Sequence, residues 1–205
     1  MKNSRFLFRV WLVLLLACIP SLTVFGQSET RSVEPSYEVS LQLIVGSNDA
    51  TSKTEVPASL GNILKHLKST FTFSNYRPAS TVLGRIANNG TFEFKSVHNF
   101  FGQQSDRDRP TFMDWSLGNF QDGLTAKGRQ GFQIETFRFG ARVPITVTST
   151  TEGAKSSSVV NYEQIGLTLR KVGLVENTPA LIGTLNLPGT DGTVFLVMTV
   201  RSTDQ

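Results

Sequence analysis

The sequence predicts an α+β fold, mostly antiparallel β, with one amphipathic helix at about residues 57–70. Many short segments alternate apolar and polar residues with a period of two, and turn-forming residues separate them. Only one segment has apolar residues at helical spacing. Neither an internal repeat nor a linker rich in Gly, Pro or Ser divides the chain. We therefore expect a single domain over 37–203, preceded by a flexible segment at 27–36.

The N-terminus has the pattern of a secretory signal peptide. Basic residues precede an apolar run from Val10 to Ile19, and these residues are Lys2, Arg5 and Arg9. The pattern predicts export and cleavage after Gly26. Cys18 leaves open the alternative of a lipoprotein signal, in which this cysteine would carry the lipid. A retained anchor is disfavoured because the run is shorter than the roughly 20 apolar residues that span a membrane.

Removal of this segment changes the charge of the chain. The whole chain has a formal charge of +4, and three of its positive charges precede the first acidic residue, Glu29, so the mature chain is near 4 − 3 = +1. Nucleic-acid binding requires clustered Lys and Arg, so we expect no nucleic-acid partner. Cys18 is the only cysteine, so an exported chain cleaved after Gly26 has no disulfide and depends on its core. The remaining 205 − 26 = 179 residues are sufficient for one domain.

The first strand and the helix have the clearest patterns. The strand alternates from 37 to 45, and its apolar positions are Tyr37, Val39, Leu41, Leu43 and Val45. Pro57 suits a first helical turn. An apolar stripe follows at helical spacing, namely Leu60, Ile63, Leu64, Leu67 and Phe71. This stripe predicts that the helix packs on a sheet, with Gly61 as a mild weakness.

The rest of the chain predicts strands. The segments with strand-like composition are 71–76, 79–86, 91–97, 112–120, 131–139, 142–148, 159–170, 178–187 and 193–202. Between 79–86 and 91–97, the sequence Ala87-Asn88-Asn89-Gly90 favours a tight hairpin turn with positive φ. The total is about eight to ten strands.

Residues that could perform catalysis are scarce. The chain has no G-x-S-x-G, G-x-G-x-x-G, P-loop or H-E-x-x-H motif. His66 lies on the polar face of the helix, and His98 either lies in a cleft or packs in the core. Asp106 and Asp108 alternate with arginines, which favours ionised surface carboxylates over a metal site or an acid–base pair. The sequence predicts no catalytic residue, no cofactor and no metal; a hydrolase is the third alternative.

Aromatic residues around 98–120 suggest a second kind of site. A ligand-binding loop at these residues would use His98, Phe100, Phe101 and Trp115, with Phe112 nearby. The competing interpretation is that these aromatic side chains fill the core. A soluble periplasmic ligand-binding module with this loop as its site is the second functional alternative.

The segment 140–170 carries a resemblance to a known family. A Gly and a Val-Pro pair lead into a tip rich in Ser and Thr, and the chain returns through V-x-Y-x-x-I-G-L-x-L. This pattern resembles bacterial secretins, the outer-membrane pore proteins of secretion systems. The matching residues are Gly140, Val143, Pro144, Val160, Tyr162, Ile165, Gly166, Leu167 and Leu169.

The resemblance implies a non-catalytic protein of the periplasm or outer membrane that acts as a structural or interaction component. It implies that the hairpin of Gly140, Val143, Pro144, Tyr162 and Gly166 lines or gates a lumen. The P-L-L-G-x-I-P-L-L-G-like segment of secretins is missing, as are their preceding ring-building modules. We expect a reduced, secretin-like protein whose copies assemble through β-strand pairing, with a homo-oligomer or an envelope protein as partner; the sequence leaves membrane contact open.

Overall fold

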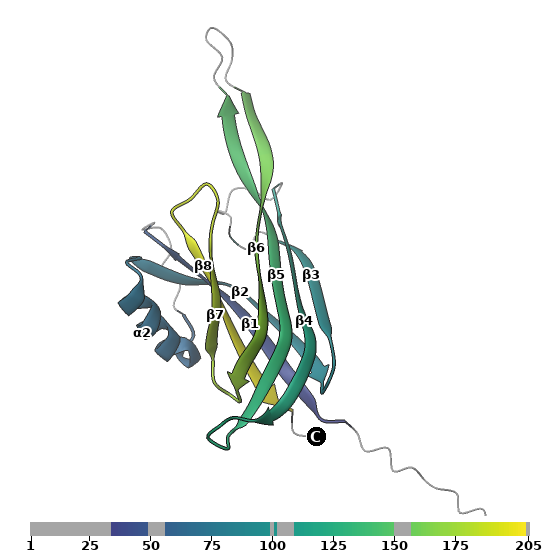
Figure 1. Ribbon diagram of the computed structural model, residues 1–205. Coiled ribbons are helices and arrows are strands. Elements are labelled where there is room, and N and C mark those ends of the chain that lie inside the picture. The colour runs from purple at the N-terminus through teal and green to yellow at the C-terminus, as the bar shows by residue number, and fades with distance from the viewer. Residues whose placement is uncertain (1–33, 49–55, 99–100, 102–108, 150–156, 204–205) are drawn as a thin grey trace, which may run out of the picture. The chain divides into compact units, whose positions relative to one another are not determined.

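Two four-stranded sheets account for most of the chain (Figure 1). The computed structural model describes residues 34–48, 56–98, 101, 109–149 and 157–203. The first sheet has the order β2-β1-β8-β7, with β1 at Ser36–Ser47, β2 at Asn75–Ala87, β7 at Ala180–Asn186 and β8 at Thr193–Ser202. The second sheet has the order β3-β4-β5-β6, with β3 at Phe92–His98, β4 at Thr111–Leu124, β5 at Gln130–Ser149 and β6 at Ser157–Val175. All neighbouring strands are antiparallel, which confirms the predicted fold class.

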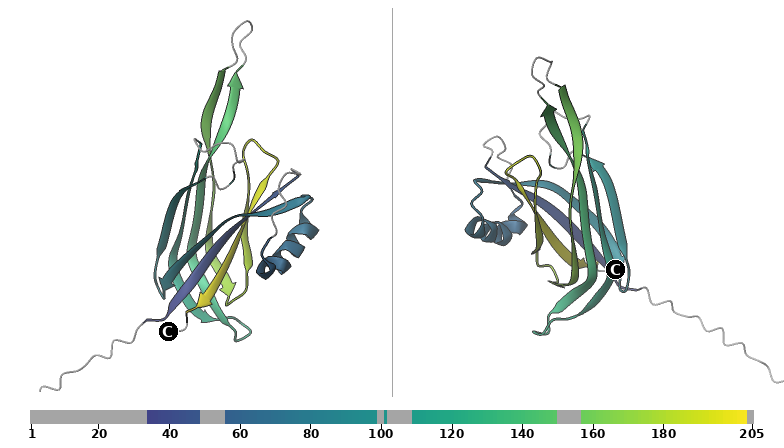
Figure 2. Two further views of the ribbon diagram at one scale, coloured as in Figure 1. Left: turned by 180° about the vertical axis from the view of Figure 1, so that it is seen from behind. Right: turned by 45° about the horizontal axis from the view of Figure 1, so that its top comes forward.

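The core lies between the two sheets, which face each other (Figure 2). The apolar positions predicted for the first strand are all at most 4% exposed and belong to this core, as do Trp115, Phe137 and Phe139 of the second sheet. β1 begins at Ser36, one residue before the predicted domain start. The predicted signal peptide and most of the segment 27–36 lie outside the described residues.

A helix covers the other face of the first sheet. It consists of a 3-10 turn at Ala58–Leu60 (η1) and an α-helix at Gly61–Thr70 (α2), as the sequence predicts for about 57–70. Its apolar stripe packs on a small second cluster around Ile44, Phe195 and Val197. This packing explains why β8 is apolar on consecutive positions, since one of its faces meets the second sheet and the other meets the helix. No helix in the described ranges is long and apolar enough to cross a membrane.

The turn at residues 87–90 differs from the prediction in one respect. The turn forms, with a hydrogen bond from the Gly90 N–H to the Ala87 carbonyl and a φ of 57° at Asn89. The strands on either side do not pair with each other as a hairpin, because β2 belongs to the first sheet and β3 to the second. A Cβ on Gly84 would lie 2.3 Å from the ring of Phe92, so the absence of a side chain at Gly84 lets the ring pack directly on β2.

A bend crosses three strands of the second sheet. Register places Asn119 of β4 and Lys171 of β6 on either side of Glu135 of β5, and Asn119 and Lys171 have φ values of 51° and 56°. Where these three residues lie, the alternation of buried and exposed side chains along β5 shifts by one residue. Ile134 before Glu135 and Phe137 after it are both fully buried, although their positions differ by an odd number. The bend therefore keeps one continuous apolar face on a sheet that changes direction.

Candidate functional site

The hairpin of β5 and β6 extends beyond its neighbours. The two strands pair from Gly131 opposite Val175 to Ser149 opposite Ser157, whereas β4 ends its pairing with β5 at Arg142. Beyond this point no strand in the described part of the chain pairs with the hairpin as a third member, and the hairpin projects from the sheets (Figure 1). We call residues 142–149 and 157–164 the arm. The prediction of a hairpin at 142–170 is confirmed, and the tip at 150–156 lies outside the described residues.

The five residues predicted for a gate lie at the base of the arm. Gly140 pairs with Gly166, and Pro144 pairs with Tyr162. A Cβ on Gly166 would lie 2.7 Å from the Phe139 carbonyl oxygen, so this position requires glycine for a close backbone approach. Val143 is 7% exposed and belongs to the core. The structure thus brings these residues together on neighbouring strands, and their role as a gate stays a prediction.

Both faces of the arm carry exposed apolar side chains among polar ones. On the face that continues the core, Val147 pairs with Val159, and these side chains are 43% and 55% exposed. On the opposite face Thr146 pairs with Val160, and the Arg109 guanidinium donates a hydrogen bond of 2.8 Å to the Thr146 hydroxyl. On the face that continues the core, Ile145 pairs with Asn161 and Val143 pairs with Glu163, so both faces of the arm mix apolar and polar side chains.

An aromatic and arginine cluster lies where the arm leaves the sheet. The Arg142 guanidinium carbon is 4.7 Å from the centre of the Phe112 ring, which is a cation–π distance. The edge of Tyr162 approaches the same ring, with a centroid distance of 5.6 Å and an interplanar angle of 63°. Arg142 was not identified from the sequence, because its contact with Phe112 depends on the register between β4 and β5.

The edges of the two sheets differ. In the first sheet, β1 and β2 shift register next to Pro78, and β7 and β8 shift between Leu181 and Gly183. Bulges and prolines of this kind blunt an edge against pairing with another chain. In the second sheet, β6 extends over 19 residues without proline, and β3 pairs with β4 without a register shift. The open edges therefore belong to the sheet that carries the arm.

Both open edges also carry partly buried apolar side chains on the core face. Phe92 and Phe94 on β3, and Ile165, Leu167 and Leu169 on β6, pack against the core without complete burial. A strand added at either edge would cover them.

Two of the four residues suggested for an aromatic binding loop, Phe101 and Trp115, lie in the core, as the competing interpretation predicts. Residues 111–120 are part of β4, and Trp115 is fully buried beneath Phe92 at a centroid distance of 4.8 Å. Phe101 is 8% exposed and part of the core. His98 ends β3, but its side chain, like Phe100, lies outside the described part of the chain. The strand predicted at 112–120 is confirmed as part of β4, in which Met113, Trp115 and Leu117 alternate into the core.

The other titratable candidates do not form a site. His66 lies on the exposed face of α2, as expected, and Asp106 and Asp108 are not among the described residues. No group of three or more His, Cys, Asp or Glu side chains that could hold a metal ion occurs in the described ranges.

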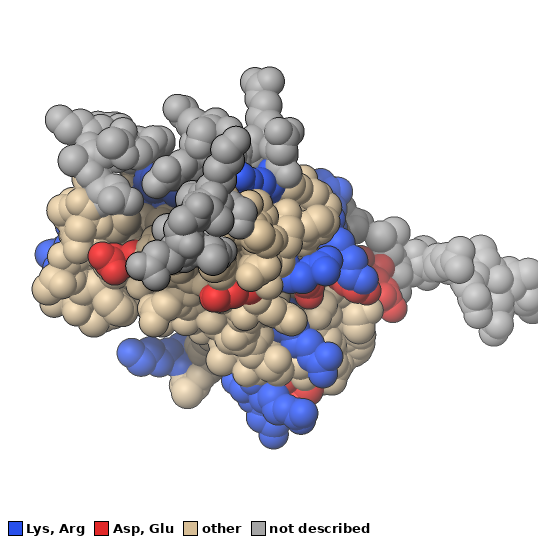
Figure 3. Space-filling view, turned by 90° about the horizontal axis from the view of Figure 1, so that it is seen from above, with Lys and Arg blue, Asp and Glu red and all other residues tan. Residues whose placement is uncertain are grey.

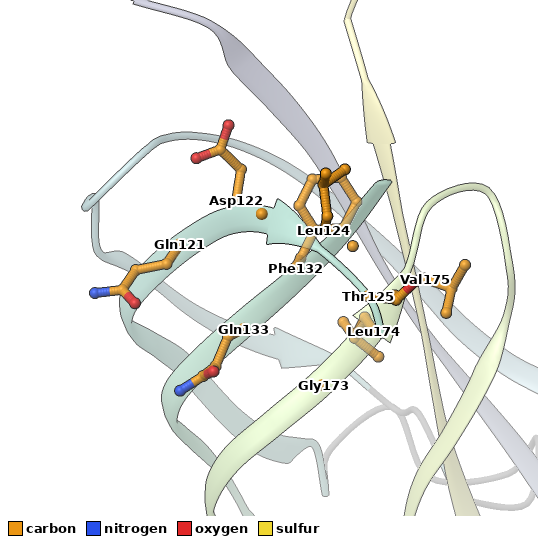
Figure 4. Close-up of a pocket in the computed structure, with 11 residues that line it drawn as sticks. Gln121, Asp122, Leu124, Thr125, Phe132, Gln133, Gly173, Leu174 and Val175 are labelled. Carbon is orange, nitrogen blue, oxygen red and sulfur yellow. The ribbon is translucent and has the colours of Figure 1, made fainter. Parts of the chain in front are cut away.

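A depression of about 330 Å³ lies at the end of the second sheet opposite the arm (Figure 4). Its floor includes the backbone of three glycines, and Gln121 and Gln133 point to one side of it. Asp122 is the only titratable side chain among the residues that line it, and this carboxylate accepts a hydrogen bond from the Tyr37 hydroxyl. Burial, followed by the bond to Asp122, raises the pKa of Tyr37 to about 12. This carboxylate therefore connects the two sheets.

Comparisons with solved structures gave similarities that include two secretins. The V. cholerae type IV competence pilus secretin PilQ is 9% identical, with a TM-score of 0.35 over 84% of this chain and 62% of that one. The secretin-domain β-barrel of InvG from the Salmonella SPI-1 injectisome is 11% identical, with a TM-score of 0.23 over 84% of this chain and 64% of that one. The chain thus covers less than two thirds of either secretin chain. No protein-family model and no curated protein sequence matches it.

Proposed function

We propose that this chain is a non-catalytic, secretin-like component of the bacterial envelope whose copies assemble edge to edge through the second sheet. One observation carries the proposal: β3, and β6 as far as Arg170, pair without a register shift and are lined by partly buried apolar side chains, whereas the strands at both edges of the first sheet shift register. The resemblance of residues 140–170 to secretins supports the same conclusion. Export to the periplasm or outer membrane follows from the N-terminal pattern.

The second sheet has an even number of antiparallel strands, which allows its copies to assemble head to tail. With four antiparallel strands, β3 and β6 run in opposite directions. If β6 of one copy lies beside β3 of the next, the pair is antiparallel while all copies keep the same orientation. Repetition of this heterologous contact gives a ring or a filament. The arms then lie side by side at one end of the assembly.

The core residues at the two edges match in spacing. Phe92 and Phe94 are two residues apart on β3, and Leu167 and Leu169 are two residues apart on β6, all on the face toward the core. Antiparallel pairing would place these side chains opposite each other and continue the core from one copy into the next. Seven residues of β3 give a contact of roughly 23 Å along the strand.

The proposed assembly is tested by placing a lysine on an edge strand of the second sheet and, as a control, on an edge strand of the first sheet. Val97 on β3 and Leu83 on β2 are 58% and 61% exposed, so lysine at either position has little effect on folding. Light-scattering mass of the exported protein, extracted in mild detergent, should show many copies for the unmodified chain and for Leu83→Lys, and one copy for Val97→Lys. A mass of one chain for the unmodified protein excludes assembly. If the Val97→Lys protein still assembles, β3 is excluded as the strand through which copies pair.

A further inference from the structure

We propose that the base of the arm is a docking site for an extended peptide that carries a carboxylate beside an apolar side chain. The site is on the outer face of the second sheet and consists of Val97, Phe112, Asp114, Arg142 and Tyr162; we call it the arm-base platform. It goes beyond the proposed assembly, because it concerns a face of the sheet; two of its residues, Val97 and Tyr162, belong to the edge strands β3 and β6.

The platform combines exposed apolar surface with a hollow. Val97 and Tyr162 are 58% and 42% exposed, and both lie on the same face as Phe112, which is partly buried. A depression of about 590 Å³ runs across β3, β4 and β5 here, which is in the range of peptide and small-ligand sites. Large exposed apolar side chains on a folded domain mark sites of interaction when they adjoin such a hollow.

Arg142 is positioned to bind a carboxylate. The guanidinium carbon lies 4.7 Å from the centre of the Phe112 ring, and this cation–π contact holds the group beside the ring. Among the described residues, no carboxylate lies within ion-pair distance of Arg142, whereas Lys95 is already paired with Glu93 at 2.7 Å. A fixed guanidinium with unused donors favours bidentate binding of a carboxylate.

Asp114 limits what else the platform accepts. It lines the same hollow as Arg142, and one of its carboxylate oxygens would be 3.1 Å from a Cβ at Gly140. A second negative charge on the ligand would be repelled there, whereas a backbone N–H or a cationic side chain would be favoured. The platform therefore accepts one carboxylate rather than a run of phosphates. Seen from above, both basic and acidic side chains occur on the described surface (Figure 3).

The contacts of Phe112 argue against a saccharide. Sugars bind proteins by stacking on an open aromatic face, but the Phe112 ring has Arg142 over it and the Tyr162 ring against it. Lipid is disfavoured because Lys95, Asp114 and Arg142 all line the hollow. A peptide can place an apolar side chain against Val97 and a carboxylate against Arg142.

The probe is the peptide acetyl-Val-Phe-Asp-Leu-amide, with the same peptide carrying Asn in place of Asp as its control. Saturation-transfer NMR with the exported, processed protein detects weak ligands whether the protein is a single chain or an assembly. We expect affinity for the Asp peptide to exceed that for the Asn peptide by about five- to tenfold, the size of one charge-assisted contact. Arg142→Gln should remove this difference, and Arg170→Gln, on the same face of the sheet, should retain it.

Three results would overturn the proposal. Equal affinity for the two peptides excludes a carboxylate site. If Arg142→Gln and Arg170→Gln reduce the affinity for the Asp peptide equally, the overall charge of the protein, rather than the platform, attracts the peptide. An Arg142-dependent signal from trigalacturonate that exceeds the signal from the Asp peptide identifies an anionic saccharide as the occupant.

Discussion

Thr111 and Thr193 are both buried, but among the described residues only one of their hydroxyl groups has a partner. Thr111, at the start of β4, is fully buried, and no described group forms a hydrogen bond with its Oγ1. Thr193 is 7% exposed, and its hydroxyl donates a hydrogen bond of 3.2 Å to the Asn186 side-chain oxygen. Valine has nearly the shape of threonine, so replacement at either site changes the polar group and little else.

The two substitutions should change stability in opposite directions. An unsatisfied buried hydroxyl costs roughly 1–3 kcal/mol, so Thr111→Val should raise the free energy of unfolding by about 1 kcal/mol or more. Thr193→Val removes the hydrogen bond to Asn186 and should lower the free energy of unfolding by about 1 kcal/mol. For a domain of this size, each change corresponds to a Tm shift of roughly 2–4 °C.

Urea denaturation followed by tryptophan fluorescence measures both variants, because Trp115 is buried and reports on the core. If Thr111→Val lowers stability as much as Thr193→Val, the Thr111 hydroxyl has a partner, such as a buried water, and the assignment of an unsatisfied group is wrong.

Three further predictions concern other parts of the fold. Gly61→Ala should stabilise the protein by about 0.4–1 kcal/mol in the same urea assay, because Gly61 has helical φ and ψ and an added Cβ would meet no atom within 4 Å. Lys171→Gly should stabilise it by roughly 0.5–1 kcal/mol, because Lys171 is exposed and has a φ of 56°; a loss of stability would show that its side chain supports the bend. The raised pKa of Tyr37 means that the folded protein holds the phenolic proton more tightly than the unfolded chain, so this stabilisation is complete below about pH 10 and is lost as the pH rises toward about 12. Between pH 9 and pH 11 the unmodified protein should therefore lose about 1 kcal/mol more than Tyr37→Phe, and parallel stability curves for the two proteins would contradict the assigned environment.

Local patterns in the sequence were sufficient to predict the strands and the helix, but they did not predict which strands lie next to each other. The alternation of 37–45 and the stripe of 60–71 predicted β1 and the helix, since each pattern depends only on which face is buried. The turn at 87–90 was predicted from Asn-Gly chemistry, but the sequence did not show that its two strands enter different sheets. That outcome depends on contacts such as Phe92 on Gly84, which lie outside the turn.

The candidate site was predicted in part. The hairpin and its glycines were found because their pattern is local, and pairing of Gly140 with Gly166 follows from the hairpin register. The phase change between Ile134 and Phe137 is visible in the sequence as a break in alternation and could have predicted the bend. Trp115 was assigned both to a predicted strand and to an alternative binding loop, because an aromatic residue in a short strand has the same local pattern as one in a loop.

Disulfide cross-linking between copies tests the central claim of edge-to-edge assembly most directly. Because Cys18 is the only cysteine and lies in the predicted signal peptide, a mature chain with Val97→Cys and, in turn, Tyr162→Cys, Gln164→Cys or Thr168→Cys can cross-link only through the introduced residues. These positions lie on the same face at the two edges of the second sheet, so at least one pair should reach disulfide distance across an antiparallel contact and give a ladder of multiples on a denaturing gel. A matched pair at the edges of the first sheet, Leu83→Cys with Thr184→Cys, should give single chains. Single chains from all three test pairs, or a ladder from the matched pair alone, would contradict assembly through the sheet that carries the arm.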